Sequence, residues 1–270
     1  MESHHHSGIS HHNSNGSSTS TTIDSLSPSL SISNSSTPPL YNSGDKKRLR
    51  ILCLHGYKQN ANLFKSKTAV LRKSLDDIAE FVYVDAPHTI DEAKGTASWW
   101  RASGDGKEYR GWETTLDYLK NIFIKKGPFD GIIGFSQGAI LSSLISSISS
   151  LNQESDNYFT GYKEISIKFS LLFSGFQSRA TVHQSLYPSN DNESNQGSYP
   201  LSKIATPSLH VWGKADELVS ASNCESLSLQ FSEPHIYIHE QGHLIPLSKK
   251  DIEHYRNFLQ QFLNNEEGLE

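Results

Sequence analysis

The sequence predicts one α/β domain built on a mostly parallel sheet. Short, continuous apolar runs, typical of strands buried on both faces, alternate with segments in which apolar residues recur at helical spacing. The chain has 270 residues, and the part that follows a polar N-terminal segment, about 220 residues, is long enough to enclose a sizeable core. We therefore expect one central sheet with helices on both faces.

The first half of the predicted domain contains two strands and two helices. Residues 50–55 carry an apolar run that ends at Gly56, which predicts a buried strand. Apolar spacing then predicts a helix over residues 62–75, and a second strand follows at 81–84. A further helical period covers residues 112–123. The stretch between the second strand and this helix has no period, so we expect it to be irregular.

The second half continues the alternation of strands and helices. Residues 129–135 form a third apolar run, and the helix predicted over 139–148 carries its apolar residues on one side. The stretch 178–200 is rich in Ser, Asn and Pro, and we expect it to be a long surface excursion. The remaining apolar patterns predict strands at 167–173, 208–212 and 235–239, and a terminal helix over 252–262.

Residues 1–47 are predicted to be a disordered tail that precedes a folded domain at 48–265. The tail has too few large apolar residues to offset the entropy cost of ordering it. It lacks the features of a secretory signal, and no arginine precedes Arg48, as a mitochondrial presequence would require, so we expect a cytoplasmic protein. The tail also contains several histidines, which we attribute to compositional bias rather than to metal binding. They are His4, His5, His6, His11 and His12.

Composition and charge argue against several classes of function. The formal net charge of −5 and the pI near 6.2 give no electrostatic basis for binding nucleic acid or an anionic membrane. No stretch approaches the ~18 consecutive apolar residues of a transmembrane helix, so we expect no stable membrane insertion. Cys53 and Cys224 are too few for a disulfide framework or a paired metal site, which favours a reducing compartment.

A candidate nucleophile lies in the segment Gly134-Phe135-Ser136-Gln137-Gly138, which matches the pattern Gly-x-Ser-x-Gly. The segment follows a predicted buried strand and precedes a predicted helix, which is the context of a nucleophile elbow. In such a tight turn, the backbone at Ser136 is strained and lifts the hydroxyl above the edge of the sheet. The alternative is a glycine-flanked serine packed in an ordinary turn between a strand and a helix.

Two backbone amides are candidates for an oxyanion hole, the pair of donors that stabilises a tetrahedral intermediate. The amide of Gln137 would begin a helix, where amides are unpaired and the helix dipole is positive. The amide of Tyr57 follows a His55-Gly56 step at the end of the first predicted strand, although a plain glycine turn explains this step equally well. We expect His55 itself to support the loop through a hydrogen bond from its ring.

A serine nucleophile needs a histidine base oriented by a carboxylate, and in α/β-hydrolases these follow in the order serine, acid, histidine. His243 lies on a loop shortly after the strand at 235–239, whereas the other histidines beyond Ser136 fall in strands, in the polar excursion or on the terminal helix. Asp216 comes just after the strand at 208–212, with Glu217 as its nearest competitor. We therefore predict His243 as the base and Asp216 as the acid.

With these residues assembled, the sequence resembles the family of serine hydrolases within the α/β-hydrolases, and in particular its branch of ovarian-cancer-associated esterases. The resemblance spans residues 49–263 and implies an α/β-hydrolase fold, no cofactor, and Ser136, Asp216 and His243 as a catalytic triad. It also places the amides of Tyr57 and Gln137 in the oxyanion hole. The motifs that carry it are Leu52-Cys53-Leu54-His55-Gly56-Tyr57, Asp85-Ala86-Pro87-His88, Trp99-Trp100, Gly127-Pro128-Phe129-Asp130-Gly131, Gly134-Phe135-Ser136-Gln137-Gly138, Gly213-Lys214-Ala215-Asp216 and Gly242-His243.

The predicted activity is hydrolysis of carboxylic esters with alkyl acyl chains through an acyl-enzyme. The substrate would be a small ester or acyl molecule, with Trp99, Trp100 and Tyr109 as candidates for its pocket, although the tryptophans fit core packing equally well. Two alternatives remain open at this point. Hydrolysis of acyl thioesters would use the same triad, and a hydrolase scaffold can also serve as a binding module without turnover.

Overall fold

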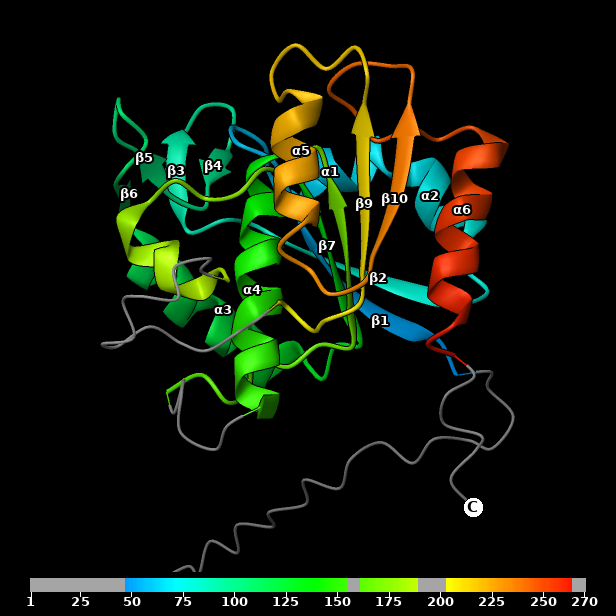
Figure 1. Ribbon diagram of the computed structural model, residues 1–270, viewed down its shortest axis with the longest axis horizontal. Helices are drawn as coiled ribbons and strands as arrows, with labels where there is room; N and C mark the ends of the chain where they lie inside the picture. Colours follow the sequence, from blue (N-terminus) through cyan, green and yellow to red (C-terminus); the bar gives the residue numbers. More distant parts are fainter. Residues whose placement is uncertain (1–46, 155–160, 189–202, 264–270) are drawn as a thin grey trace, which may run out of the picture. The chain divides into compact units, whose positions relative to one another are not determined.

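A six-stranded sheet forms the centre of the computed structural model, which describes residues 47–154, 161–188 and 203–263 (Figure 1). Every pairing between its neighbouring strands is parallel. The strands lie close to the predicted positions, and the four inner ones, β1, β7, β8 and β9, have their apolar runs buried on both faces, whereas the edge strands β2 and β10 are partly exposed. They are β1 (Leu49–Leu54), β2 (Ala79–Val84), β7 (Gly131–Phe135), β8 (Phe169–Phe173), β9 (Ser208–Gly213) and β10 (Pro234–His239).

The order of the strands indicates which part of the sheet edge binds a ligand, without reference to any side chain. The sheet runs β10-β9-β8-β7-β1-β2, so the chain moves outward from β1 to β2 and then returns to β7 on the other side of β1. The carboxyl ends of the strands lie at one edge, because all pairs are parallel. In open α/β sheets, ligands bind at this edge, beside the point where the strand order reverses. Here that point lies between β1 and β7.

Helices cover both faces of the sheet, as predicted (Figure 1). One face packs against α3 (Trp112–Lys126), α4 (Gln137–Glu154) and α5 (Ala221–Ser228). The other face packs against α1 (Ala61–Lys67), α2 (Ala69–Ser74) and α6 (Lys249–Gln260). Among the helices that the structure describes, none is both long and apolar enough to cross a bilayer.

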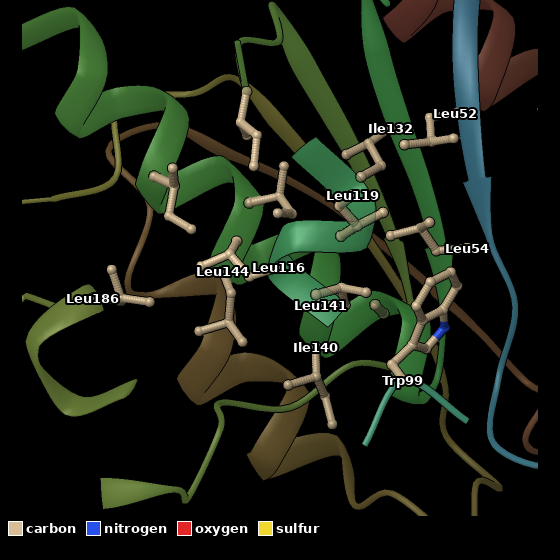
Figure 2. Packing of buried hydrophobic residues seen from close by; sticks show 14 of the residues in the cluster. Leu52, Leu54, Trp99, Leu116, Leu119, Ile132, Ile140, Leu141, Leu144 and Leu186 are labelled. Carbon is tan, nitrogen blue, oxygen red and sulfur yellow. The ribbon is translucent and has the colours of Figure 1, made fainter. Parts of the chain in front are cut away.

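Helix α4 is more deeply buried than its predicted one-sided pattern indicates. Figure 2 shows Ile140, Leu141 and Leu144 of this helix within the core cluster that also contains Leu54 and Trp99. The serines between them are fully buried as well, because surrounding segments also cover the opposite side of the helix. Each serine hydroxyl forms a hydrogen bond to a nearby group, in most cases a backbone carbonyl. These serines are Ser142, Ser143, Ser146, Ser147, Ser149 and Ser150.

The stretch predicted to be irregular forms two small antiparallel pairs. The first joins β3 (His88–Asp91) to β4 (Thr96–Ser98), and the second joins β5 (Arg101–Ala102) to β6 (Tyr109–Arg110). Strands of two to four residues are too short to show an alternating pattern, so the sequence prediction missed them. These pairs lead into α3, and several of their side chains lie at the edge of the sheet where the strands have their carboxyl ends.

The helix predicted over residues 62–75 is divided in two at Thr68. The Thr68 hydroxyl bonds the carbonyl of Phe64 and the hydroxyl of Tyr83, so α1 ends and α2 begins on a side chain anchored to the sheet. Helix α5 was not predicted, because its eight residues are mostly small and polar. The side chain of Ser220 caps this helix by accepting from the amide of Asn223.

The prediction of a surface excursion over residues 178–200 is wrong for the part that the structure describes, residues 178–188. A 3-10 helix, η1 (Thr181–Leu186), occupies this part. The side chains of His183 and Leu186 in this helix, and of Tyr187 directly after it, are buried in the core. The polar composition concealed these anchors because they are separated by polar residues. The remainder of the excursion and nearly all of the predicted tail lie outside the described residues.

We predict that acid destabilises the protein through His183. Burial among Trp100, Tyr109 and Trp112 lowers the pKa of His183 from its ordinary 6.5 to about 4. Between these two values the unfolded chain binds a proton that the folded chain does not, so stability falls as the pH falls through this window. The expected loss is about 2–3 kcal/mol by pH 4.

Urea unfolding of the wild type and of His183→Gln, at neutral pH and near pH 4.5, measures this contribution. His183→Gln lowers stability at both values, but its stability should fall less between them than that of the wild type. Buried His210, whose pKa is likewise lowered by burial, to about 3, leaves a residual slope in both proteins. Equal slopes for the two proteins would contradict the assignment to His183.

Candidate active site

Ser136 occupies the turn between β7 and α4, at the point where the strand order reverses. Its backbone is left-handed, with φ +54°, a region that non-glycine residues rarely adopt. The turn is held on both sides, because the amide of Ser136 donates to the Phe173 carbonyl at 2.9 Å and its carbonyl accepts from the Ala139 amide at 2.9 Å. The sequence-predicted elbow therefore has the strained strand-to-helix geometry that presents a serine hydroxyl.

Two backbone amides near Ser136 have no acceptor among the residues that the structure describes. The first is the amide of Gln137, which begins α4, and the second is the amide of Tyr57, in the turn after β1. Both residues line the same cleft as Ser136. Free amides at a helix start and a neighbouring loop are suitable donors to an oxygen that becomes negatively charged.

His55 supports the loop that carries Tyr57. Its ring nitrogen Nδ1 lies 2.8 Å from the Gly56 carbonyl, and its Nε2 accepts from the amide of Ala86 at 3.0 Å. These two bonds fix a neutral ring with the proton on Nδ1. Burial, the strongest influence, lowers the pKa of His55, so it stays neutral near pH 7. The structure thus bears out the structural role predicted for this residue.

The side chain of Gln137 has a role that the sequence analysis did not predict. Its Oε1 accepts from the amide of Trp99 and its Nε2 donates to the carbonyl of Trp100, both at 3.0 Å. The indole of Trp99 in turn donates to the His55 carbonyl at 2.8 Å. One glutamine therefore links the segment of the two tryptophans to the start of α4 and, through Trp99, to the loop after β1.

We predict that Gln137→Ala loosens the wall of the cleft while keeping the backbone amide. Losing both side-chain bonds leaves two buried backbone groups unsatisfied, which should lower the free energy of unfolding by about 1–3 kcal/mol. For ester substrates we expect KM to rise more than kcat falls. Urea unfolding and steady-state kinetics test this, with the exposed Gln260→Ala as the matched control. Equal effects of the two variants would argue against the proposed link.

Asp216 and His243 come together from the turns after β9 and β10. Nδ1 of His243 lies 2.7 Å from Oδ2 of Asp216, while Oδ1 accepts from the amides of Leu218 and Val219 at 2.9 Å. The Asp216 side chain is fully buried, and that of His243 is 15% exposed. The carboxylate is therefore held on one side by backbone amides and directed on the other toward the imidazole.

These contacts keep Asp216 ionised. Burial is the strongest single influence and opposes ionisation, but the hydrogen bonds from the Val219 amide, the His243 ring and the Leu218 amide together outweigh it. The net result is a pKa of the Asp216 carboxyl below its ordinary value of 3.8. Near neutral pH the carboxylate can therefore hold the His243 ring with its Nδ1 proton inward and Nε2 free to accept a proton.

Among the described residues, none of three other carboxylates, Glu217, Asp130 and Asp85, forms an ion pair with His243. Glu217 is exposed, and Asp130 precedes β7, so it lies at the opposite edge of the sheet. Asp85 accepts a hydrogen bond at 2.7 Å from the amide of Ala61, the first residue of α1. The remaining histidines beyond Ser136 have other hydrogen-bond or ring partners, and they are His183, His210, His235, His239 and His254.

A cleft of about 680 Å³ opens beside Ser136. Trp100 and Tyr109 stack on each other at 4.7 Å between ring centroids and line the cleft, as expected of pocket residues. Trp99 does not: it is fully buried beside Leu54 in the core cluster, which corrects its assignment to the pocket (Figure 2). Apolar side chains complete this part of the lining, namely Tyr57, Ile90, Ala102, Ile140 and Phe176.

The structure does not join Ser136 to His243 by a hydrogen bond among the residues that it describes. The imidazole instead lies against the ring of Phe135, with 4.9 Å between ring centroids. Phe135 directly precedes Ser136, so His243 packs against the residue next to the candidate nucleophile. Contacts between a serine and its base are often loose in the absence of a substrate.

A parallel sheet flanked by helices, with a left-handed serine between a central strand and the following helix, defines the class of α/β-hydrolases. Within this class, a family model described as serine hydrolase (FSH1) matches residues 45–255. The chain belongs to this family of serine hydrolases. The resemblance and the fold predicted from the sequence are both confirmed.

Similar proteins are described as esterases. The chain is 33% identical over 243 residues to Esterase OVCA2 of Xenopus tropicalis, covering 81% of this chain and 95% of that protein. It is 31% identical over 240 residues to Esterase CG5412 of Drosophila melanogaster, covering 82% and 78%. Among solved structures, acyl-protein thioesterase 2 of Zea mays matches with a TM-score of 0.57 and 18% identity, over 81% of this chain and 95% of that one. At this identity the last likeness concerns the fold alone.

Proposed function

We propose that this serine hydrolase cleaves carboxylic esters, with Ser136 as nucleophile, His243 as base and Asp216 as the acid that orients the base. The observation that carries the proposal is the 2.7 Å bond between His243 and Asp216, at the same sheet edge as the left-handed Ser136. A serine hydroxyl is a weak nucleophile, and a neutral imidazole backed by a carboxylate is the usual means of activating it.

In the first half of the reaction, Nε2 of His243 accepts the Ser136 proton as Oγ attacks the ester carbonyl. The carbonyl oxygen becomes negative and accepts hydrogen bonds from the amides of Tyr57 and Gln137. The intermediate then expels the alcohol, which takes the proton from His243, and the acyl group remains on Ser136. Asp216 stays ionised throughout and stabilises the imidazolium.

In the second half, water replaces the alcohol. His243 accepts a proton from the water as its oxygen attacks the acyl carbonyl, and then returns that proton to Oγ of Ser136 as the carboxylic acid leaves. The apolar lining around Trp100 and Tyr109 suits an alkyl acyl chain, because burying each methylene contributes about 0.8 kcal/mol. No step requires a metal or an organic cofactor.

A panel of nitrophenyl esters of graded acyl-chain length, assayed beside matched acyl thioesters, tests this function. We expect turnover of the oxygen esters, with kcat/KM rising with chain length until the cleft is filled. Higher rates on every thioester would assign thioester hydrolysis instead, since the same residues serve both reactions. Absence of turnover by the wild type, with substrate binding retained in Ser136→Ala, would indicate a binding module.

A further inference from the structure

The charged side chains of the cleft are all positive. Lys58, Arg101 and Arg179 contribute to its lining, and none of the described residues that line it is an aspartate or a glutamate. The chain as a whole has a formal net charge of −5, so these cations do not reflect a generally basic protein. They come from three separate segments, after β1, in β5 and after β8, which the fold brings to one cleft.

These three cations are not neutralised within the described part of the chain, where none has an ion-pair partner within 4 Å. Arg101 uses one nitrogen to donate to the Thr89 carbonyl at 2.9 Å. Nζ of Lys58 lies 5.4 Å from the ring centroid of Tyr57. Their charges are thus positioned by neutral groups and remain available to a ligand.

Arg179 is an exposed residue whose guanidinium is held in place by packing contacts. Its guanidinium carbon lies 5.8 Å from the ring centroid of Phe176, another residue that lines the cleft. The guanidinium also packs on Gly106, where an added Cβ would lie 3.3 Å from its atoms. No hydrogen bond from the Arg179 guanidinium is formed to any described residue. A guanidinium has five N–H donors in a planar fork suited to carboxylate and phosphate oxygens.

We propose that the natural ester carries an anionic group, a carboxylate or a phosphate, which Arg179 binds while Arg101 and Lys58 add attraction. This inference rests on the proposed function and names the chemical class of its substrate. An apolar wall of Trp100, Tyr109 and Ile140 beside the cations fits a substrate with an apolar segment between the ester and the charge. The anion can belong to the acyl chain or to the leaving group.

Two matched substrate pairs distinguish these sources. Nitrophenyl hexanoate and the nitrophenyl monoester of adipate differ only by a carboxylate at the end of the acyl chain. The hexanoyl thioesters of N-acetylcysteamine and of phosphopantetheine differ in the leaving group, where only the second carries a phosphate. We expect the charged member of one pair to be preferred by about tenfold in kcat/KM, with the preference shrinking as salt is added. The preferred pair identifies the position of the anion.

Arg179→Gln should remove most of this preference, because it should lower kcat/KM for the charged member of the preferred pair far more than for its uncharged partner. Arg179→Lys keeps a positive charge and should retain part of the preference. The matched control is Lys73→Gln, which removes one positive charge from an exposed position of α2 outside the cleft and should change nothing. Thermal unfolding verifies that each variant is folded.

Results of two kinds would overturn the inference, and the experiment distinguishes between them. Turnover of hexanoate with no preference for the charged member of either pair, or a preference that survives in Arg179→Gln, overturns the anionic substrate and leaves the ester hydrolase intact. A folded wild type that hydrolyses none of the four substrates and resists labelling by a fluorophosphonate probe overturns the proposed function, and this inference with it.

Discussion

Replacing His243 by alanine should lower kcat/KM for nitrophenyl esters by about 10⁴- to 10⁶-fold. Without the imidazole, Ser136 loses the base proposed to accept its hydroxyl proton, and Asp216 loses its hydrogen bond to the ring. The cleft and its two free amides are unchanged, so KM should change far less than kcat. A residual rate above that in water is expected from the oxyanion donors and from binding alone.

His235→Ala is the matched control for this measurement. His235 belongs to β10, the strand that precedes His243, but its side chain is exposed and its ring lies 5.3 Å from that of Phe258, away from Asp216. It should keep wild-type kinetics within about twofold, as surface substitutions outside a site usually do. Wild-type rates for His243→Ala on every ester in the panel would refute its assignment as the base.

The second large effect is expected on stability, from Gly138→Ala. A Cβ added at Gly138 would lie 2.1 Å from the carbonyl oxygen of Leu54 and 2.7 Å from that of His55. Both obstacles are backbone at the end of β1 and cannot turn aside like a side chain. The start of α4 and the loop after β1 must separate, which should cost about 3 kcal/mol or more of unfolding free energy.

The same separation moves the amides of Tyr57 and Gln137 apart, so Gly138→Ala should also reduce kcat in whatever protein remains folded. Urea unfolding and kinetics on purified protein measure both effects. Gly161→Ala is the control, because its added Cβ meets no atom of the described residues within 4 Å. Similar stabilities for Gly138→Ala and Gly161→Ala would show that the contact between α4 and β1 is looser than the distances from Gly138 indicate.

Much of the sheet could be predicted because parallel strands buried on both faces have continuous apolar sequences. The runs ending at Leu54 and Phe135 are of this kind, and both occur as predicted. Elements without such a pattern were missed: the short strands between His88 and Arg110, the polar helix α5, and the serine-rich side of α4. Their conformations depend on tertiary contacts that have no local signature.

The candidate site shows the same division. The positions of Ser136, Asp216 and His243 follow from chain order and strand ends, since parallel strands bring their carboxyl ends to one edge. The side-chain bonds of Gln137 to the tryptophan segment had no signal in the sequence. Neither did the convergence of Lys58, Arg101 and Arg179, because it depends on how short loops fold over the sheet edge.

We propose the left-handed serine between β7 and α4 as the nucleophile of an ester hydrolase. Labelling the folded protein with a fluorophosphonate probe and locating the adduct by peptide mass spectrometry tests it most directly. We expect a single adduct on Ser136 in the wild type and none in Ser136→Ala. A folded wild type that remains unlabelled, or an adduct on another residue, would contradict it.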